Sequence, residues 1–162
     1  MPLIYCTSES LPAEAVLDKL LDLLTDIFTN QSREEWLTDL TTKATYPGFQ
    51  LIVALDGDRV VGCKIGYDWQ PYSQSTTTFY SWLGGVDPAY RGQGIASELM
   101  RLQHGACILA GYGIIRTHTY NQWHDMLILN LRHGFQIIGT QPGKHGLTIM
   151  LEKTLGVAVI RP

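Results

Sequence analysis

The stretch that decides the fold is Asp87-Pro-Ala-Tyr-Arg-Gly-Gln-Gly-Ile-Ala-Ser97, which lies between an apolar run typical of a strand and a run with helical periodicity. Gly92 and Gly94 remove side chains at two places where a backbone must approach another group closely. A helix that begins here presents its first N–H groups without intrahelical partners, at the positive end of its dipole. Together with the guanidinium of Arg91, these donors form a site for an anion such as a pyrophosphate. The sequence therefore predicts a phosphate-bearing ligand that is held mainly by backbone.

The segments on either side of this stretch predict a β-α-β unit. Residues 78–86 have an apolar strand pattern, residues 94–110 have a helical pattern that Gly111 ends, and residues 114–119 form a second strand pattern. The strands of such a unit usually run parallel to each other or lie as neighbours.

The rest of the chain continues the alternation of strands and helices. A Ser32-x-x-Glu35 capping box begins one helix, the Pro47-Gly48 pair ends it, and Asp56-Gly57-Asp58 predicts a hairpin. Residues 70–77 are expected to form a polar loop, and residues 156–160 an edge strand or an interface. The other expected elements are strands at residues 3–6, 51–55, 59–67, 135–139 and 147–152 and helices at residues 10–28 and 123–133.

A family resemblance follows from these motifs. The run Arg91-Gly-Gln-Gly-Ile-Ala96 resembles the Arg/Gln-x-x-Gly-x-Gly/Ala motif of the GCN5-related N-acetyltransferases, and residues 79–88 are similar to that family's fourth strand and its bulge. Asn121, residues 126–130 and the pair Gly134-Phe135 are similar to the family's last conserved block. The resemblance extends over residues 50–153. It implies one α/β domain over residues 1–162, with a mixed, mostly antiparallel sheet of six to seven strands, about four flanking helices, and splayed fourth and fifth strands.

The resemblance also implies acetyl-coenzyme A as the co-substrate of an N-acetyltransferase. The backbone at Gly84, Gly85 and Val86 would hold the pantetheine arm, although a pair of glycines also serves tight packing. Asn121 and Asn130 are further candidate partners of the cofactor, and Asn121 has the alternative role of a helix N-cap. The pyrophosphate would bind the loop residues Arg91, Gly92, Gln93, Gly94, Ile95, Ala96 and Ser97.

The candidate catalytic residues depart from the pattern of many relatives. The reaction that the resemblance implies is direct attack of an amine on the thioester, with the Val86 N–H as donor to the oxyanion. Tyr80 stands where many relatives carry a Glu or His base, and Asn130 stands where many carry a Tyr acid. Asparagine has no proton to give near neutral pH, so Asn130 donates only a hydrogen bond. A water chain to Tyr80, or His118 near the end of the fifth strand, is therefore considered as the base.

Each of these side chains also has a plainer structural role. A histidine at the position of His118 is more often a strand residue that faces away from the site, and a tyrosine at the position of Tyr80 is more often a sheet-face aromatic. Further base candidates are His124, Tyr67 and Asp68.

Composition excludes several other classes of protein. The net charge of −3 gives no basic face for nucleic acid, and no apolar run is long enough to span a membrane. The three cysteines, Cys6, Cys63 and Cys107, have no disulfide or zinc spacing, and the histidines have no ligand-like spacing, so neither a disulfide frame nor a metal is expected. The N-terminus lacks a signal peptide's charged region, which predicts a cytoplasmic protein.

The acceptor and the oligomeric state are less constrained. The acceptor would be a primary amine of a small molecule or a protein, bound between the first two helices and a loop at residues 140–146. Four acidic residues could attract a cationic amine or simply form a solvated helix face; they are Asp26, Glu34, Glu35 and Asp39. The apolar residues 156–160 are a weak indication of a homodimer.

Two rival functions remain at the level of sequence. One keeps the fold and binds acyl-coenzyme A without catalysis, as a sensor or structural part. The other is a dinucleotide-binding domain, because Gly92-x-Gly94-x-x-Ser97 approaches the GxGxxG pattern. The absence of an acidic residue near residues 112–115 and of a second β-α-β half disfavours the dinucleotide site.

Overall fold

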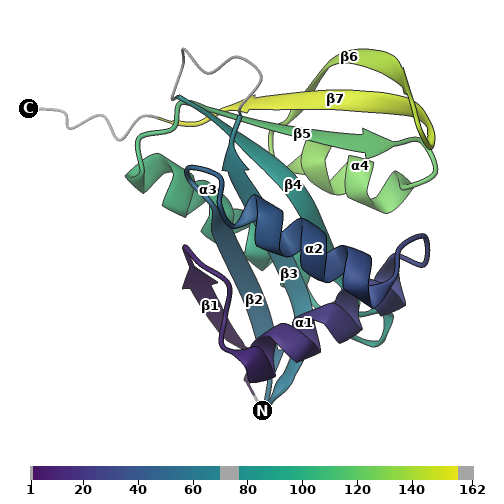
Figure 1. Cartoon of the computed structure of the whole chain (residues 1–162). Helices are drawn as coiled ribbons and strands as arrows, with labels where there is room; N and C mark the ends of the chain where they lie inside the picture. Colours follow the sequence, from purple (N-terminus) through teal and green to yellow (C-terminus); the bar gives the residue numbers. More distant parts are fainter. Residues whose placement is uncertain (1, 70–76, 157–162) are drawn as a thin grey trace, which may run out of the picture. The chain divides into compact units, whose positions relative to one another are not determined.

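The computed structural model describes residues 2–69 and 77–156. Within these residues, seven strands form one mixed sheet in the order β1-β2-β3-β4-β5-β7-β6, with β4 and β5 parallel. This arrangement, with four α-helices, confirms the predicted fold class (Figure 1). The elements are β1 Ile4–Ser8, α1 Glu14–Ile27, α2 Arg33–Lys43, β2 Gln50–Asp56, β3 Arg59–Asp68, β4 Thr78–Val86, a 3-10 turn Pro88–Tyr90, α3 Ile95–Leu109, β5 Ile114–Tyr120, α4 His124–Arg132, β6 Gln136–Gly143 and β7 Gly146–Thr154.

Contacts divide the chain into two compact units. Unit 1 contains the residues up to Asp68 together with Leu83–Gln103, and unit 2 contains Trp69–Trp82 and the residues from His104 onward. The expectation of a single domain stays a prediction. The loop expected at residues 70–77 lies outside the described residues apart from Thr77, as does the segment at residues 156–160 apart from Gly156.

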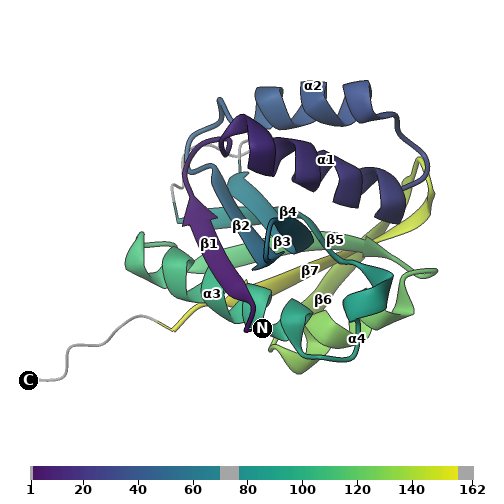
Figure 2. The same cartoon turned by 90° about the horizontal axis from the view of Figure 1, so that it is seen from below.

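In unit 1, helices cover both faces of the strands β1 to β3 (Figure 2). The helices α1 and α2 lie on one face, and α1 buries Leu20 and Leu24, one turn apart, completely. The N-terminal half of α3 lies on the other face, where a Cβ at Gly62 would be 3.1 Å from side-chain atoms of Ile95 and Leu99. A glycine in the middle of β3 thus lets the helix that follows the loop approach the sheet closely.

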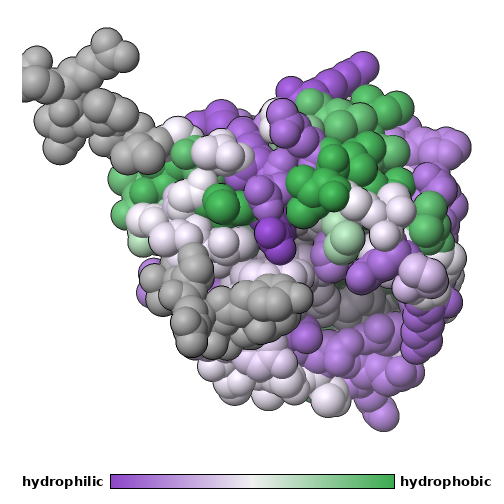
Figure 3. Space-filling view, turned by 90° about the horizontal axis from the view of Figure 1, so that it is seen from above, coloured by the Kyte–Doolittle hydropathy of each residue, from purple (hydrophilic) through white to green (hydrophobic). Residues whose placement is uncertain are grey.

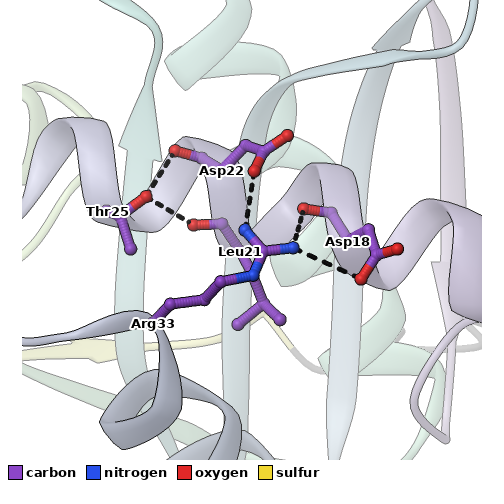
Figure 4. A network of polar contacts seen from close by, with 5 residues as sticks. All are labelled: Asp18, Leu21, Asp22, Thr25 and Arg33. Carbon is purple, nitrogen blue, oxygen red and sulfur yellow. Dashed lines mark hydrogen bonds and ion pairs between the residues drawn. The ribbon is translucent and has the colours of Figure 1, made fainter.

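The predicted helix start at Ser32 is confirmed. The Ser32 hydroxyl accepts from the Glu35 amide and the Glu35 carboxylate accepts from the Ser32 amide, both at 3.2 Å, which is a capping box. This cap directs the Arg33 guanidinium back to α1, where it donates to Asp22 Oδ1 at 2.6 Å and to Asp18 Oδ1 at 3.3 Å (Figure 4). Both ion pairs are substantially exposed, so they connect α2 to α1 but contribute little to the free energy of unfolding.

The β2–β3 hairpin is also as predicted. Asp56 faces Arg59 across a turn in which Gly57 has φ +62°, the left-handed conformation that glycine adopts without strain. The β3 register places Lys64 opposite Ile52 and Cys63 opposite Val53.

In unit 2, the parallel ladder between β4 and β5 covers the pairs from Thr78–Ile114 to Ser81–Thr117, although both strands continue beyond it. This short ladder fits the expectation that the two strands splay. The Thr117 hydroxyl donates to the Ser81 carbonyl at 2.9 Å at the last of these pairs. Beyond it, β5 remains paired antiparallel with β7 as far as Tyr120.

Two predictions about unit 2 are wrong. The expected loop at residues 140–146 is mostly strand, because β6 and β7 stay paired until only Lys144 and His145 separate them. Pro142 is compatible with this because β6 is an edge strand, where a missing N–H breaks no ladder bond. The N-cap of α4 is Trp123, without a side-chain cap, so Asn121 does not serve in that role.

The surface of unit 2 carries exposed apolar side chains on α4 and β6, namely Ile128, Leu131, Ile137 and Ile138. Figure 3 shows that hydrophobic areas lie among hydrophilic ones on the face that is seen from above. Within residues 2–69 and 77–156, no helix is long and apolar enough to cross a membrane.

Candidate active site

The loop before α3 has the backbone conformation that its glycines predict. Gly92 and Gly94 both have φ +80°, and a Cβ built on either would meet no atom within 4 Å. The Glu98 amide donates to the Gly94 carbonyl at 3.0 Å as the first bond of the helix, so the amides of Ile95 and Ala96 have no intrahelical acceptor. Backbone donors and open space therefore coincide at the positive end of the α3 dipole.

A cavity of about 110 Å³ opens at this loop. Its walls include most of the residues predicted to bind the cofactor phosphates, but not Gln93. Arg91 is anchored beside the cavity, since its Nε donates to the Val86 carbonyl at 3.2 Å. Tyr90 also lines the cavity and was missed, although it stands directly before Arg91 in the motif. The full lining is Val86, Tyr90, Arg91, Gly92, Gly94, Ile95, Ala96 and Ser97.

A polar network holds this loop against the β2–β3 hairpin. The Tyr90 hydroxyl donates to Asp56 at 2.5 Å, and this hydrogen bond raises the pKa of Tyr90. Arg59 lies 2.7 Å from the Asp87 carboxylate and 5.5 Å from the centre of the Tyr90 ring. Asp87 also accepts from the Ala89 amide at 2.9 Å, which caps the 3-10 turn. Charge and cap together fix the start of the loop.

The paired glycines at the end of β4 are tightly packed. A Cβ at Gly85 would lie 3.0 Å from Ile27 Cδ1 of α1, and a Cβ at Gly84 would lie 3.2 Å from Lys64 Nζ of β3. The alternative that these glycines serve close packing is therefore supported. A side chain at Gly85 would therefore require the Ile27 side chain to shift. Sequence reasoning did not single out Lys64, whose buried ammonium beside Gly84 depends on the register of β3.

A larger cavity, of about 410 Å³, lies in unit 1 between α1 and the β2–β3 hairpin. Asp26 is the one member of the four predicted acidic residues that lines it. Glu35 instead serves the α2 cap, and Asp39 accepts a hydrogen bond from Gln31 at 2.6 Å. The charge of the wall is mixed, because Arg59 and Lys19 face four carboxylates. The lining residues are Lys19, Asp22, Leu23, Thr25, Asp26, Asp58, Arg59, Val60 and Asp87.

The two titratable side chains proposed as bases lie together in unit 2. Tyr80 Oη is 3.5 Å from His118 Nδ1, and both rings pack against Trp69, with centroids 5.0 Å and 5.8 Å from it. Burial raises the pKa of Tyr80 to about 12, and burial and then Arg116 lower the pKa of His118. At neutral pH the phenol therefore keeps its proton and the imidazole is neutral, so His118 is the better base of the two.

The remaining candidates differ in burial. Asn130 is 2% exposed, and its Oδ1 has no hydrogen-bond partner in the part of the chain that the structure describes. Asn121 is exposed just after β5, and His124 is exposed in the first turn of α4. Tyr67 is buried edge-on against Tyr46, with ring centroids 5.0 Å apart, as a core aromatic would be.

The cysteines are free, and Cys63 and Cys107 are buried as expected. Among residues 2–69 and 77–156, no three His, Cys, Asp or Glu side chains are grouped closely enough to hold a metal ion.

A sheet with parallel β4 and β5 strands and a glycine-containing loop between β4 and α3 are the features of the family that the sequence resembles. The model of the acetyltransferase (GNAT) family matches residues 17–128, which is more than half of the chain. The chain belongs to this family. No curated protein matches the sequence closely enough to count as a relative.

Solved structures share the fold at low sequence identity. A chain of the NatC complex, solved with Gag peptide and CoA, is 18% identical with a TM-score of 0.78, over 96% of this chain and 100% of that one. Aminoglycoside 6'-acetyltransferase type Ii is 19% identical with a TM-score of 0.74, over the whole of both chains. The yncA protein of Salmonella typhimurium, solved with its cofactor acetyl-CoA, is 14% identical with a TM-score of 0.74, over 100% of this chain and 99% of that one. These likenesses support the fold alone.

Proposed function

We propose that this protein is an N-acetyltransferase that uses acetyl-coenzyme A. The observation that carries the proposal is the loop before α3, where two glycines at φ +80° leave open space at the start of a helix whose first amides lack intrahelical acceptors. A pyrophosphate needs this combination, because its oxygens must reach several N–H groups without meeting a Cβ. Two proteins of similar structure were solved with CoA and with acetyl-CoA, which supports the same choice.

Each group of predicted residues has a proposed task. Arg91 and the amides of residues 92–97 hold the phosphates, and the backbone of Gly84–Val86 holds the pantetheine arm. The cofactor supplies an acetyl thioester. The Val86 N–H donates to the acetyl oxygen, where negative charge develops. Asn121 and Asn130 are proposed as side-chain partners of the cofactor, and the unpaired Oδ1 of buried Asn130 supports an acceptor role.

The acceptor must lose a proton before or during its attack on the thioester. His118 is proposed to take this proton through Nδ1 or through an intervening water, because its neutral ring is available at physiological pH. Tyr80 orients the imidazole from 3.5 Å rather than acting as the base, since its pKa of about 12 leaves little phenolate.

The acceptor class is a primary amine of a small molecule or of a protein. The cavity of about 410 Å³ is proposed as its site, because the carboxylates there attract an ammonium group. A cytoplasmic location and a homodimer stay predictions.

Calorimetric titration with acetyl-coenzyme A tests the proposal. We expect micromolar binding by the wild type, and loss of binding in Gly94→Glu, which would place a carboxylate where the phosphates bind. Gly57→Glu is the matched control, since it also has positive φ and an open environment but lies in the β2–β3 turn. If the wild type binds no acetyl-coenzyme A, the proposed cofactor is wrong, and the dinucleotide-binding alternative has to be tested instead.

The second candidate function is a non-catalytic acyl-coenzyme A sensor. A measurement of thioester turnover distinguishes it from an acetyltransferase. Incubation with a panel of primary amines should release free coenzyme A thiol only when an acceptor is present. Tight binding with an intact thioester across the panel would favour the sensor.

A further inference from the structure

Lys64 is an unusual residue for the middle of a sheet. It is only 7% exposed, and its Nζ lies beside the backbone of β4, 3.2 Å from where a Cβ of Gly84 would be. No described carboxylate lies within ion-pair distance of it, whereas buried lysines are normally paired. The absence of a side chain at position 84 therefore accommodates a buried ammonium group that no described carboxylate compensates.

The residues that strand pairing and the Gly84 contact place beside Lys64 carry no charge. Its partner across the ladder on β2 is Ile52, and on β4 it faces Gly84. The α3 side chains that approach the same strand, near Gly62, are Ile95 and Leu99. Burial is the main cause that lowers the pKa of Lys64 to about 8, and the neighbouring Cys63 opposes this shift. At pH 7 most molecules therefore still carry the ammonium form.

We propose that Lys64 is a catalytic acid that protonates the sulfur of coenzyme A as it leaves. The inference rests on the proposed function, in which the backbone of Gly84–Val86 holds the acyl-bearing arm and so places the thioester near Nζ. As the acceptor nitrogen forms its bond to the acetyl carbon, the C–S bond breaks and its electron pair stays on sulfur. Nζ gives its proton to sulfur, the attacking amine loses its proton to the general base, and Lys64 regains a proton from solvent.

The protonation state favours an acid over a base at this position. An ordinary thiol has a pKa of about 8.5 and Lys64 one of about 8, so the two groups are close enough in pKa for the ammonium to share or transfer its proton to a thiolate at little cost. As a base, Lys64 would have to be neutral, which is the minor form at pH 7. Asn130 has no proton to give, and Tyr80, with a pKa of about 12, would give its proton to a thiolate uphill.

The first test uses the wild type and coenzyme A alone. Thiolate absorbs in the ultraviolet where thiol does not, so titrating the bound cofactor with pH gives the pKa of its sulfur. An ammonium beside the sulfur should lower this pKa by about one unit or more relative to free coenzyme A. An unshifted thiol pKa in a saturated complex would overturn the role of Lys64 and leave the cofactor assignment intact.

The second test uses Lys64→Met, which keeps the length of the stem, with Lys43→Met of α2 as the control. We expect coenzyme A affinity within about threefold of wild type, a thiol pKa that returns to the free value, and a kcat lower by about 100-fold, which is the size of a general-acid contribution. The control should change none of these. Unchanged kcat and thiol titration in Lys64→Met would overturn the inference, whereas a wild type that binds no coenzyme A would refute the proposed function itself.

Discussion

The carboxylate of Asp87 joins the guanidinium of Arg59 at 2.7 Å, and with its other oxygen accepts from the Ala89 amide. One side chain thus links the first residue of β3 to the turn that leads into the glycine loop. The Asp87 side chain is 13% exposed, so its charge is screened less than that of the other ion pairs in unit 1.

Replacing Asp87 with Asn should weaken cofactor binding without unfolding the protein. Asn keeps an oxygen for the Ala89 amide but loses the charge that attracts Arg59, so the loop before α3 becomes less ordered. We expect acetyl-coenzyme A affinity to fall about three- to tenfold, equivalent to roughly 1 kcal/mol. Calorimetry measures the affinity, and Arg33→Met, which removes the exposed pairs with α1, should leave it unchanged. Equal affinities in wild type and Asp87→Asn would contradict this role.

His118 and Tyr80 should differ in how they affect the pH dependence of turnover. A base must be neutral, and burial lowers the pKa of His118, so the acidic limb of kcat should lie below the ordinary histidine value. His118→Gln should remove that limb and lower kcat by about 100-fold or more. Tyr80→Phe should keep the limb and cost less, because it removes only a contact of 3.5 Å to the imidazole. If the acidic limb of the kcat profile remains in His118→Gln, another residue is the base.

Lys64 should also make the stability of the ligand-free protein depend on pH. Its pKa falls from the usual 10.5 to about 8 on folding, so below pH 8 folding confines a charged group and costs free energy. Between pH 8 and pH 10.5, Lys64 is neutral in the folded protein but still protonated in the unfolded chain. The free energy of unfolding therefore rises with pH across this range, and the cost is gone above pH 10.5. Lys64→Met should therefore raise the free energy of unfolding at pH 7, by roughly 1–3 kcal/mol, and the difference should shrink toward pH 10.5. Chemical denaturation at several pH values measures it, and a destabilised variant at pH 7 would contradict the expectation.

The features that could be predicted from the sequence are those encoded by consecutive residues. The capping box at Ser32, the Gly57 turn and the loop from Arg91 to Ser97 each depend on local backbone conformation, and the structure has them at the expected places. Lys64 could not be found in this way, because its position beside Gly84 requires the register of β3 and the path of β4. The wall of the larger cavity likewise combines α1, the β2–β3 hairpin and Asp87. The loop prediction at residues 140–146 was wrong because Pro142 and Gly143, which usually favour turns, lie here in an edge strand that tolerates both residue types.

The three thiols should react at very different rates. Cys6 is exposed on β1, whereas burial raises the pKa of both Cys63 and Cys107 to about 12. Since the thiolate is the reactive form, a disulfide reagent at pH 8 should modify one thiol quickly and the other two only on unfolding. Cys6→Ser should abolish the fast phase. A second fast thiol in native wild type would show that a buried cysteine becomes accessible.

Gln103 offers a way to stabilise the protein from inside α3. Its side chain is 0% exposed, and neither its amide nitrogen nor its oxygen has a hydrogen-bond partner within residues 2–69 and 77–156. A buried amide without partners carries a desolvation cost, so the similarly shaped Gln103→Met should raise the free energy of unfolding by about 1–2 kcal/mol. Thr117→Val is the contrasting control: it removes the buried hydroxyl that donates to Ser81 O at 2.9 Å and should lower the free energy of unfolding by about 1 kcal/mol. Denaturant unfolding measures whether each variant has a higher or a lower free energy of unfolding than wild type. A destabilised Gln103→Met would mean that the amide has a polar partner in solution.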